Sequence, residues 1–547
     1  MHIQLAQLNF TIGDLDKNCK KIIDFYSKHQ NSSDLVIFSE LAISGYPPED
    51  LLLKGYFLDK IEGKIKLLAD HTKSKKAAIL IGSPVRIFDK YGSAALFNSA
   101  ILIENGFIKE LFHKKELPNH GVFDEKRYFT ASNNLKNIKF RGLNIAVLIC
   151  EDIWNLKNSF LLIEQEIDLI ISINSSPFEH NKLLTRIDRV KKFNQNLQKN
   201  IIYLNQVGGN DSLIFDGSSF VIGKNNELAL SLKEFEEDSA LIEIDDYSDI
   251  DSSGEFFMSE EERIYSALIL GLRDYVSKND FQNVVIGLSG GIDSALVATI
   301  AADALGIKNV RLIALPSKYN SSQSFIDAKN LSDNLSINLE QIPIQDIFNE
   351  VESSLQSIFG GKDVDFTEEN IQSRIRGLLL MAVSNKFGNL LLSTGNKSEL
   401  ATGYATLYGD MNGAYNPIKD IYKTELYKLS KWRNKNIPRI SKLQKDNIIP
   451  ENIIVKEPTA ELRESQKDSD SLPDYSILDQ ILYLIIEEQM SEEQVISKNF
   501  NPEIVKKVVK LFYNNEFKRR QSVIGPKISK MSFDGDRRYQ ITNRFKN

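Results

Sequence analysis

The sequence predicts an α/β protein built in two parts, the second of them around a doubly wound parallel sheet. Apolar runs of strand length recur along the 547 residues, and helix-like polar segments separate several of them. An acidic stretch with serine and glycine but no usable periodicity, residues 245–257, divides these runs into two series. In the second series the spacing leaves room for crossover helices, which parallel strands require.

The strand candidates follow in chain order on both sides of that stretch. Residues 1–244 form the first predicted domain, whose candidates are DLVIFSE, KAAILIGSPV, NSAILIENG, NIAVLICED, DLIISINSSPF, NIIYLNQVGG and SSFVIG. We interpret residues 245–257 as a linker and residues 258–547 as the second domain. Its candidates are NVVIG, NVRLIALPS, LEQIPI and NLLLSTGN.

Composition restricts the kind of protein. Two cysteines in 547 residues predict no disulfide framework. The N-terminal MHIQLAQLNF has no signal-peptide pattern, and no uncharged apolar run approaches the roughly 18 residues of a membrane span, so we expect a soluble, cytoplasmic protein without a membrane partner. A net charge of −7 argues against nucleic acid as a partner. All six histidines precede residue 181, which excludes a histidine base or histidine-based zinc site from the second domain.

The stretch NIAVLICEDIW places Cys150 at the end of a continuously apolar strand. Polar residues follow it directly, and ligands gather at the carboxyl edge of an α/β sheet. Free cysteine is also among the most buried residue types, so Cys150 is either a core residue or a nucleophile. Its position alone does not decide between the two.

Two further stretches supply groups that would activate a thiol. LVIFSELAISGYPPEDL ends a strand at Glu40, and FHKKELPNHGVFDEKRYF supplies lysines before a loop. Glu40 would accept the thiol proton, a lysine would stabilise the oxyanion of a tetrahedral intermediate, and Cys150 would attack an amide carbon. The backbone N–H of Glu151 is the expected second oxyanion donor.

These residues resemble the nitrilase superfamily, whose Glu-Lys-Cys triad occurs in E-x-x-x-x-G-Y, K-x-x-L and C-E-D-x-x patterns in that order. The resemblance implies an α-β-β-α sandwich with Glu40 as base, Lys114 as catalytic lysine and Cys150 as nucleophile. Lys114 is preferred because the family's lysine lies three residues before a leucine, and Lys115 remains the alternative. Glu125 is similar to an auxiliary glutamate that holds the lysine.

Glutamine is the substrate that the same resemblance implies for this domain. INSSPFEHNKLLTR contains Ser176 and Lys182, which match positions that hold the polar end of the substrate in glutaminase members. His120 occupies a place where those relatives usually have tyrosine, so its role stays open. For all three residues an ordinary polar loop position is the alternative.

The second domain opens with VVIGLSGGIDSALV, in which a strand leads into Ser289-Gly290-Gly291 and then a helix from about Ala295 to Leu305. Glycines let the backbone turn tightly and direct N–H groups at phosphate, and the helix N-terminus adds partial positive charge. The pattern is neither a Walker loop nor a dinucleotide fingerprint. A tight connection without a ligand is the alternative.

This loop resembles the S-G-G-x-D-S loop of ATP pyrophosphatases, which adenylate a carbonyl oxygen and release pyrophosphate. The resemblance implies a Rossmann-like fold of the adenine nucleotide alpha hydrolase type. ATP would be held by Gly287, Leu288, Ser289, Gly290, Gly291, Ile292, Asp293 and Ser294. The carboxylate of Asp293 suits magnesium.

The rest of the second domain resembles NAD synthetase. The matching runs are ENIQSRIRGLLLMAVSN, LLLSTGNKSELATGYATLYGDMNGAYNPIKDIYKTELYKL, EPTAELRESQKDSDSLPDY, FKRRQ and KIS. With the first domain, the order is that of the glutamine-dependent members of this family. The resemblance implies that nicotinic acid adenine dinucleotide (deamido-NAD) is amidated with ATP, magnesium and nitrogen from glutamine.

Individual residues are assigned from that resemblance. Thr394 would contact ATP, and Asp293 with Glu399 would bind magnesium. Asn370, Glu399 and Lys518 would bind the deamidated dinucleotide, with Arg374 near them and Asp410 in the same segment. Outside these motifs such charged residues would be interpreted as a solvated surface.

The pairing of the two domains has a chemical reason. Ammonia released into water becomes mostly ammonium, which has no lone pair to attack an adenylate, so a protected passage between the sites is expected. The family also implies a homo-oligomer. Two alternatives remain: another ATP-dependent amidotransferase or nucleic-acid thiolase with the same loop, and a non-catalytic nucleotide-binding or scaffold protein.

Overall fold

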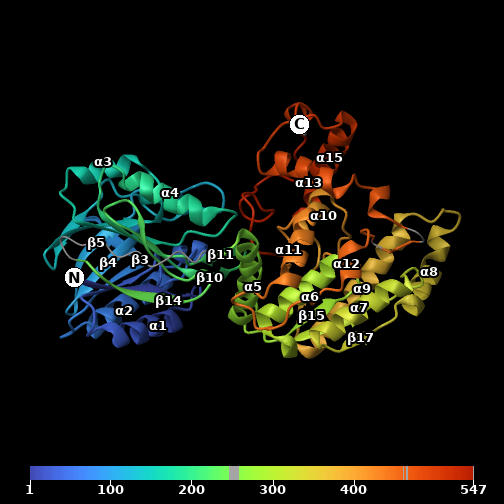
Figure 1. The fold of residues 1–547 in the computed structure, drawn as a ribbon, viewed down its shortest axis with the longest axis horizontal. Helices are drawn as coiled ribbons and strands as arrows, with labels where there is room; N and C mark the ends of the chain where they lie inside the picture. The colour runs from blue at the N-terminus through green and yellow to red at the C-terminus, as the bar shows by residue number, and fades with distance from the viewer. Residues whose placement is uncertain (245–257, 460, 464–465, 546–547) are drawn as a thin grey trace. The chain divides into compact units, whose positions relative to one another are not determined.

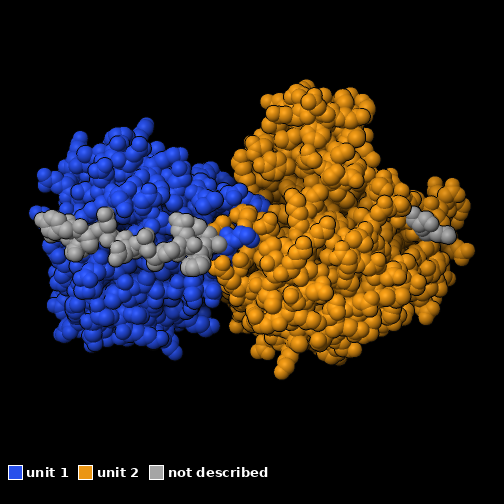
Figure 2. All heavy atoms as spheres, viewed as in Figure 1, with its two compact units in different colours: residues 1–259 blue, residues 260–547 orange. Residues whose placement is uncertain are grey.

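The computed structural model divides the chain into two compact units, Met1–Ser259 and Glu260–Asn547, shown in different colours in Figure 2. The predicted linker 245–257 lies outside the residues that the structure describes. Those described are residues 1–244, 258–459, 461–463 and 466–545.

Unit 1 contains two six-stranded sheets. The first has the order β14-β1-β2-β3-β4-β5, in which β1, β2 and β3 run parallel and the other neighbours antiparallel. Its strands are β1 (His2–Gln7), β2 (Leu35–Phe38), β3 (Ala78–Phe88), β4 (Ala94–Glu104), β5 (Phe107–His113) and β14 (Asp238–Glu243).

The second sheet of unit 1 has the order β13-β12-β9-β8-β7-β6, with β7, β8 and β9 parallel. Its strands are β6 (Asn137–Phe140), β7 (Leu143–Ile149), β8 (Leu169–Asn174), β9 (Asn200–Asn205), β12 (Phe220–Ile222) and β13 (Leu228–Ser231). A separate antiparallel pair is formed by β10 (Val207–Asn210) and β11 (Leu213–Asp216).

Helices cover the outer faces of both sheets, which gives four layers (Figure 1). Apolar residues of α1 (Leu15–His29) and α2 (Gly55–His71) pack against the first sheet, and those of α3 (Lys157–Ile163) and α4 (Lys182–Asn194) against the second. In β2, Leu35 and Ile37 enter the core between the sheets while Val36 and Phe38 face the helices, because side chains alternate along a strand. The expected α-β-β-α sandwich is confirmed.

Unit 2 is built on a parallel sheet of order β17-β16-β15-β18. Its strands are β15 (Val284–Gly287), β16 (Val310–Ala314), β17 (Leu339–Gln341) and β18 (Leu390–Leu392), each within a predicted candidate. From β15 the chain moves outward through β16 and β17 and then returns to β18 on the other side, so the doubly wound sheet is confirmed. Such a reversal leaves a crevice at the carboxyl ends of β15 and β18, where ligands bind.

Helices surround the sheet of unit 2, and the C-terminal helices pack together around an apolar core of their own (Figure 1). The helix predicted after the glycine loop begins earlier than expected, at Ile292, because Gly291 is its N-cap. The helices are α5 (Glu260–Lys278), α6 (Ile292–Leu305), α7 (Ser322–Leu335), α8 (Gln345–Phe359), α9 (Phe366–Phe387), α10 (Lys397–Thr402), α11 (Lys423–Lys435), α12 (Glu451–Val455), α13 (Tyr475–Ile486), α14 (Glu492–Ile496), α15 (Pro502–Asn514) and α16 (Glu516–Arg519).

No helix in the described parts of the chain combines the length and the apolar character that a membrane crossing requires.

Candidate active sites of the two units

In unit 1, three strand ends place Glu40, Lys114 and Cys150 at one site. Glu40 follows β2, Lys114 follows β5, and Cys150 follows β7. Lys114 Nζ donates to Glu40 Oε1 at 2.7 Å, and both side chains are fully buried. The charges of Glu40 and Lys114 both act on the Cys150 thiol. A carboxylate, an ammonium and a thiol are therefore brought together from two different sheets.

The backbone of Cys150 is unusual. Its φ of 47° lies in the left-handed region, which non-glycine residues rarely adopt and which is found at functional sites when the surroundings enforce it. The residue is 4% exposed and also contacts the apolar core between the sheets. Burial and then the charge of Glu40 raise the pKa of the thiol well above its usual value, while Lys114 opposes the shift. The resting residue is therefore a neutral thiol, and the carboxylate of Glu40 lies close enough to act on it.

A second carboxylate completes this cluster. Glu125 Oε1 accepts from Lys114 Nζ at 2.8 Å and from the Tyr46 hydroxyl at 2.9 Å. Burial opposes the charge on Lys114, but the carboxylates of Glu125 and Glu40 outweigh it and hold the pKa of Lys114 well above its usual value. Burial also raises the pKa of Glu125, against the pull of Lys114. Lys114 is thus charged and fixed between two acids.

The two lysines of the HKKEL segment have different surroundings. Lys115 Nζ contacts Glu116 Oε1 at 2.6 Å and Asn158 Oδ1 at 3.1 Å, and its side chain is 23% exposed. Lys114 instead points into the buried cluster with Glu40 and Glu125. The geometry favours Lys114 as the lysine that acts with Cys150.

The three residues assigned to glutamine differ in placement. Ser176 is buried, and its hydroxyl accepts from Arg186 Nε at 3.0 Å. Lys182 begins α4, where its ammonium lies 3.2 Å from Glu179 Oε1 and 5.1 Å from the centre of the Trp154 ring. The side chain of His120 is 69% exposed, and its Nε2 lies 3.9 Å from Glu151 Oε1. His120 therefore borders the site from the solvent side.

Unit 2 contains a cavity of about 860 Å³. It lies at the carboxyl ends of β15 and β18, the crevice expected from the strand order. Predicted site residues that line it are Gly287, Leu288, Ser289, Gly291, Ile292, Asp293, Ser294, Asn370, Thr394, Glu399, Asp410 and Lys518. Residues spread over more than 200 positions of the sequence therefore meet at one cavity.

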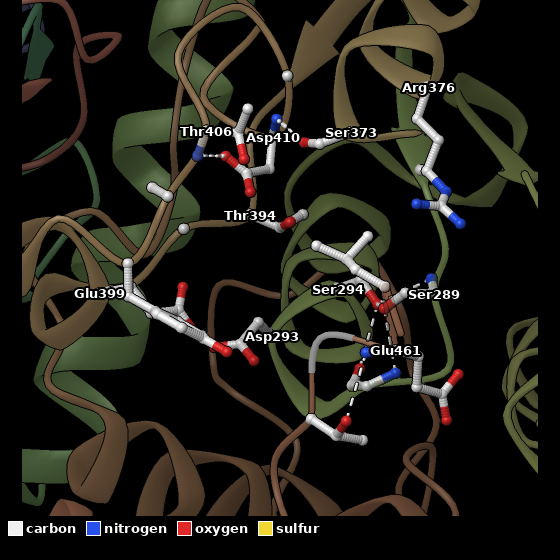
Figure 3. Close-up of a pocket in the computed structure, with 18 of the residues that line it drawn as sticks. Ser289, Asp293, Ser294, Ser373, Arg376, Thr394, Glu399, Thr406, Asp410 and Glu461 are labelled. Atoms are coloured by element: carbon white, nitrogen blue, oxygen red, sulfur yellow. Dashed lines mark hydrogen bonds between the residues drawn. The ribbon is translucent and has the colours of Figure 1, made fainter. Parts of the chain in front are cut away.

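The glycine loop forms one wall of this cavity (Figure 3). Gly290 has a φ of +82°, and a Cβ there would lie 2.1 Å from the carbonyl oxygen of Ser324, so only glycine fits. Ser294 Oγ lies 3.0 Å from Ser289 Oγ and closes the turn. The N-terminus of α6 follows directly, which directs backbone N–H groups and partial positive charge at the cavity.

Asp293 and Glu399 point toward one another across the cavity (Figure 3). The ammonium of Lys423 lies 2.5 Å from Asp293 Oδ2 and 3.4 Å from Glu399 Oε1. Burial and then the charge of Asp293 raise the pKa of Glu399 to about 8, and Lys423 opposes the shift. The two carboxylates thus share the cation that Lys423 supplies.

A further group of polar residues borders the cavity near Asp410. Thr406 N–H donates to Asp410 Oδ1 at 2.7 Å, and burial raises the pKa of Asp410 to about 6. Asn370 Oδ1 accepts from Thr406 Oγ1 at 2.9 Å. Lys518 Nζ donates to the carbonyls of Gly403 and Ala405, at 2.7 and 2.8 Å. Arg374 is exposed and does not line the cavity, although its charge acts on Lys518.

Several contacts were not found from the sequence. Ser175 N–H donates to Glu40 Oε2 at 2.9 Å, and Asn98 Nδ2 to Glu40 Oε1 at 2.8 Å. Neither residue belongs to a motif of its own, although Ser175 precedes the predicted Ser176. Lys423 lies inside a run that was matched as a whole, where the residue type alone gave no reason to single it out.

Comparisons with known proteins agree with this division. Residues 3–249 match the carbon-nitrogen hydrolase family and residues 264–522 the NAD synthase family. The glutamine-dependent NAD(+) synthetase of Thermotoga maritima is 42% identical over 100% of this chain and 99% of its own. That of Acinetobacter baylyi is 42% identical over 99% and 98%. The structure of the glutamine-dependent NAD+ synthetase from Acinetobacter baumannii with adenosine diphosphate is 39% identical, with a TM-score of 0.78 over 99% and 98% of the chains.

Fold and site together define a two-part ligase in which a carbon-nitrogen hydrolase unit precedes an ATP-dependent synthase unit. The likeness extends over nearly the whole chain, which the two alternative classes do not explain. The chain belongs to the glutamine-dependent NAD(+) synthetase family.

Proposed function

We propose that unit 1 hydrolyses glutamine to ammonia and that unit 2 uses this ammonia to amidate deamido-NAD to NAD at the expense of ATP. One observation carries the proposal: a single chain holds both the buried Glu40-Lys114-Cys150 cluster and a cavity walled by the glycine loop. Full-length likeness to the family supports it.

The first reaction begins with Glu40 as the base. Glu40 takes the thiol proton while Cys150 sulfur attacks the side-chain amide carbon of glutamine. Lys114, fixed by Glu40 and Glu125, and the backbone N–H of Glu151 stabilise the oxyanion. The proton on Glu40 then passes to the leaving ammonia, and water hydrolyses the thioester to glutamate. Lys115 points away from this cluster and has no part in the scheme.

Glutamine would be held at the edge of this cluster. Ser176 is fixed by Arg186, and Lys182 brings an ammonium that suits the carboxylate of the substrate. His120, on the solvent side, would border the entrance and not the reacting atoms.

In the second reaction the nicotinate carboxylate attacks the α-phosphorus of ATP and pyrophosphate leaves. The backbone of Gly287 to Ser294 would hold the phosphates, and Thr394 would contact the same nucleotide. Ammonia then attacks the adenylated carbonyl carbon and displaces AMP. Asn370, Glu399 and Lys518 would hold the deamidated dinucleotide in the same cavity, which Asp410 also lines.

Magnesium fits the carboxylates of Asp293 and Glu399. Hard oxygen ligands suit this ion, which usually takes one or two carboxylates and completes its shell with phosphate and water. Among the residues that the structure describes, no group of three or more acidic, histidine or cysteine side chains is placed to hold a metal ion. When bound, the ion would neutralise phosphate charge. Lys423 holds both carboxylates in place.

A homo-oligomer is supported by large apolar side chains exposed on α8 and α9 and between them. Large exposed apolar side chains that gather on one face can mark a protein contact, and in a twofold dimer the same face of both copies is used. The side chains are Ile347, Ile358, Phe359, Val364, Phe366, Leu378 and Phe387. Light scattering of Ile358→Glu beside the unchanged protein tests this, because Ile358 is 75% exposed and does not line the cavity, as Val364 and Phe366 do: a smaller assembly is expected, and an unchanged mass would contradict it.

The proposed function is tested with Cys150→Ala. NAD formation from deamido-NAD and ATP should disappear with glutamine and persist with high ammonia. Asp293→Ala, the matched variant in unit 2, should lose synthesis with either donor while still releasing glutamate from glutamine. Absence of NAD formation by the unchanged protein with both donors would refute the function.

A further inference from the structure

Asp152 connects the two sheets at the point where Lys114 and Cys150 must meet. Its Oδ1 accepts the backbone N–H groups of Lys115 at 3.0 Å and Glu116 at 2.8 Å. Its Oδ2 accepts the N–H of Ile149 at 3.0 Å. One carboxylate thus binds the two residues after Lys114 and the residue before Cys150, and it is 1% exposed.

This connection crosses from one sheet to the other. Lys114 follows β5 of the first sheet, and its own N–H donates to the carbonyl of Asn98 at 2.9 Å. Cys150 follows β7 of the second sheet. Aliphatic side chains fill most of the space between the sheets, and such packing is not directional. Hydrogen bonds with defined geometry are needed to fix a thiol relative to an ammonium.

A neighbouring amide strengthens the same link. Asn158 Nδ2 donates to the carbonyl oxygen of Asp152 at 2.8 Å, and Asn158 Oδ1 accepts from Lys115 Nζ at 3.1 Å. The left-handed backbone at Cys150 is therefore held by one hydrogen bond at the residue before it and by another two residues after it. Strained backbone of this kind persists only where its surroundings enforce it.

We propose that Asp152 is a positioning residue for glutamine hydrolysis: its carboxylate sets the placement of Lys114 relative to the Cys150 thiol. The inference rests on the proposed function of unit 1. Asp152 touches no reacting atom in that scheme, and it acts through the backbone of both partners. Burial raises its pKa to about 7, although its three N–H donors favour the charged form.

Asp152→Asn is the sharpest test because it preserves size while replacing one acceptor oxygen with an NH2 group. Three backbone donors then face a single oxygen, so at least one N–H meets another donor whichever way the amide lies. Displacement by a fraction of an ångström to 1 Å should lower the kcat of glutamine hydrolysis about 10- to 100-fold. KM for glutamine should stay within about threefold, since the oxyanion exists only in the transition state.

Asp168→Asn is the control for the chemical change, at an aspartate that is exposed where Asp152 is buried. Asp168 Oδ2 accepts the N–H of Asn144 at 2.7 Å, at the opposite end of β7 from Cys150. The same chemical change there should leave kcat unchanged. Glutamate release and ammonia-dependent NAD formation are measured on each preparation, and the second activity should be that of the unchanged protein in both variants.

The outcomes separate positioning from general stability. A fall in kcat with KM and ammonia-dependent synthesis preserved supports the proposal. An unchanged kcat, an equal loss in Asp168→Asn, or a joint loss of both activities in a folded Asp152→Asn overturns it. If circular dichroism shows that Asp152→Asn does not fold, Asn158→Ala is measured instead. A fall in its kcat with KM preserved supports the proposal, and an unchanged kcat overturns it. Failure of the proposed function of unit 1 is distinguishable, because the unchanged protein would then release no glutamate from glutamine.

Discussion

Glu40 and Glu125 both contact Lys114, yet only Glu40 is assigned as the base, so their glutamine variants should differ. Glu125→Gln keeps the shape of the side chain and removes its charge. Glu125 Oε1 lies 2.8 Å from Lys114 Nζ in a buried site, so the bond changes from a charged to a neutral acceptor. A hydrogen bond to a neutral acceptor stabilises Lys114 by about 1–1.5 kcal/mol less than one to a charged acceptor, which corresponds to a loss of about five- to twelvefold in kcat.

Glu40→Gln should cost far more, because no other group in the scheme accepts the thiol proton. Loss of a general base lowers rates about 10²- to 10⁴-fold. Glutamate release at saturating glutamine is measured for both variants, and ammonia-dependent NAD formation in the same samples shows that unit 2 is intact. Equal losses, or a larger loss in Glu125→Gln, would refute the assignment of Glu40 as base.

Three more predictions concern unit 2. Gly290→Ala should abolish synthesis with either nitrogen source, because its Cβ would meet Ser324 oxygen at 2.1 Å, while glutamate release persists; retained synthesis would contradict this. Asp303→Asn should lower the melting temperature by weakening the buried bonds to Arg433 at 2.8 and 2.9 Å, at a cost of about 3–5 kcal/mol; an unchanged thermal transition would argue against it. Burial lowers the pKa of Lys518, so its charge is lost at a lower pH than usual and KM for deamido-NAD should rise toward alkaline pH. Lys518→Arg should flatten that rise, and equal pH profiles would exclude Lys518 as its cause.

The sequence predicted best those residues that end an apolar run. Glu40 and Cys150 were found because a buried strand followed by polar residues marks a sheet edge, and the glycine loop because its backbone conformation restricts the residue type. The pairing of strands that lie far apart in the sequence is not marked by any such pattern of residue types. β1 and β14 come from opposite ends of unit 1 and pair antiparallel, and neither was predicted.

Asn98 and Asp152 illustrate what spacing does not reveal. Asn98 lies within β4, and it reaches Glu40, which follows β2, because β2, β3 and β4 are consecutive in the sheet. Asp152 is two residues from Cys150, but its partners Lys115 and Glu116 lie in the segment that follows β5 of the other sheet. Such roles depend on how the sheets face one another, which no local pattern of residue types determines.

The charge balance of the unit 1 cluster explains how a thiol with a raised pKa can serve as the nucleophile. Burial and then the charge of Glu40 raise the pKa of the Cys150 thiol well above its usual value, so forming a free thiolate within the cluster would be costly. Attack on glutamine avoids that cost. In the proposed scheme the thiol proton would move onto Glu40 as the charge moves to the oxyanion, so the total charge would be unchanged and Lys114 would stabilise the new anion. Cys150 would therefore be reactive only when an amide carbon is in place, which agrees with a neutral thiol at rest and with a site that requires no histidine.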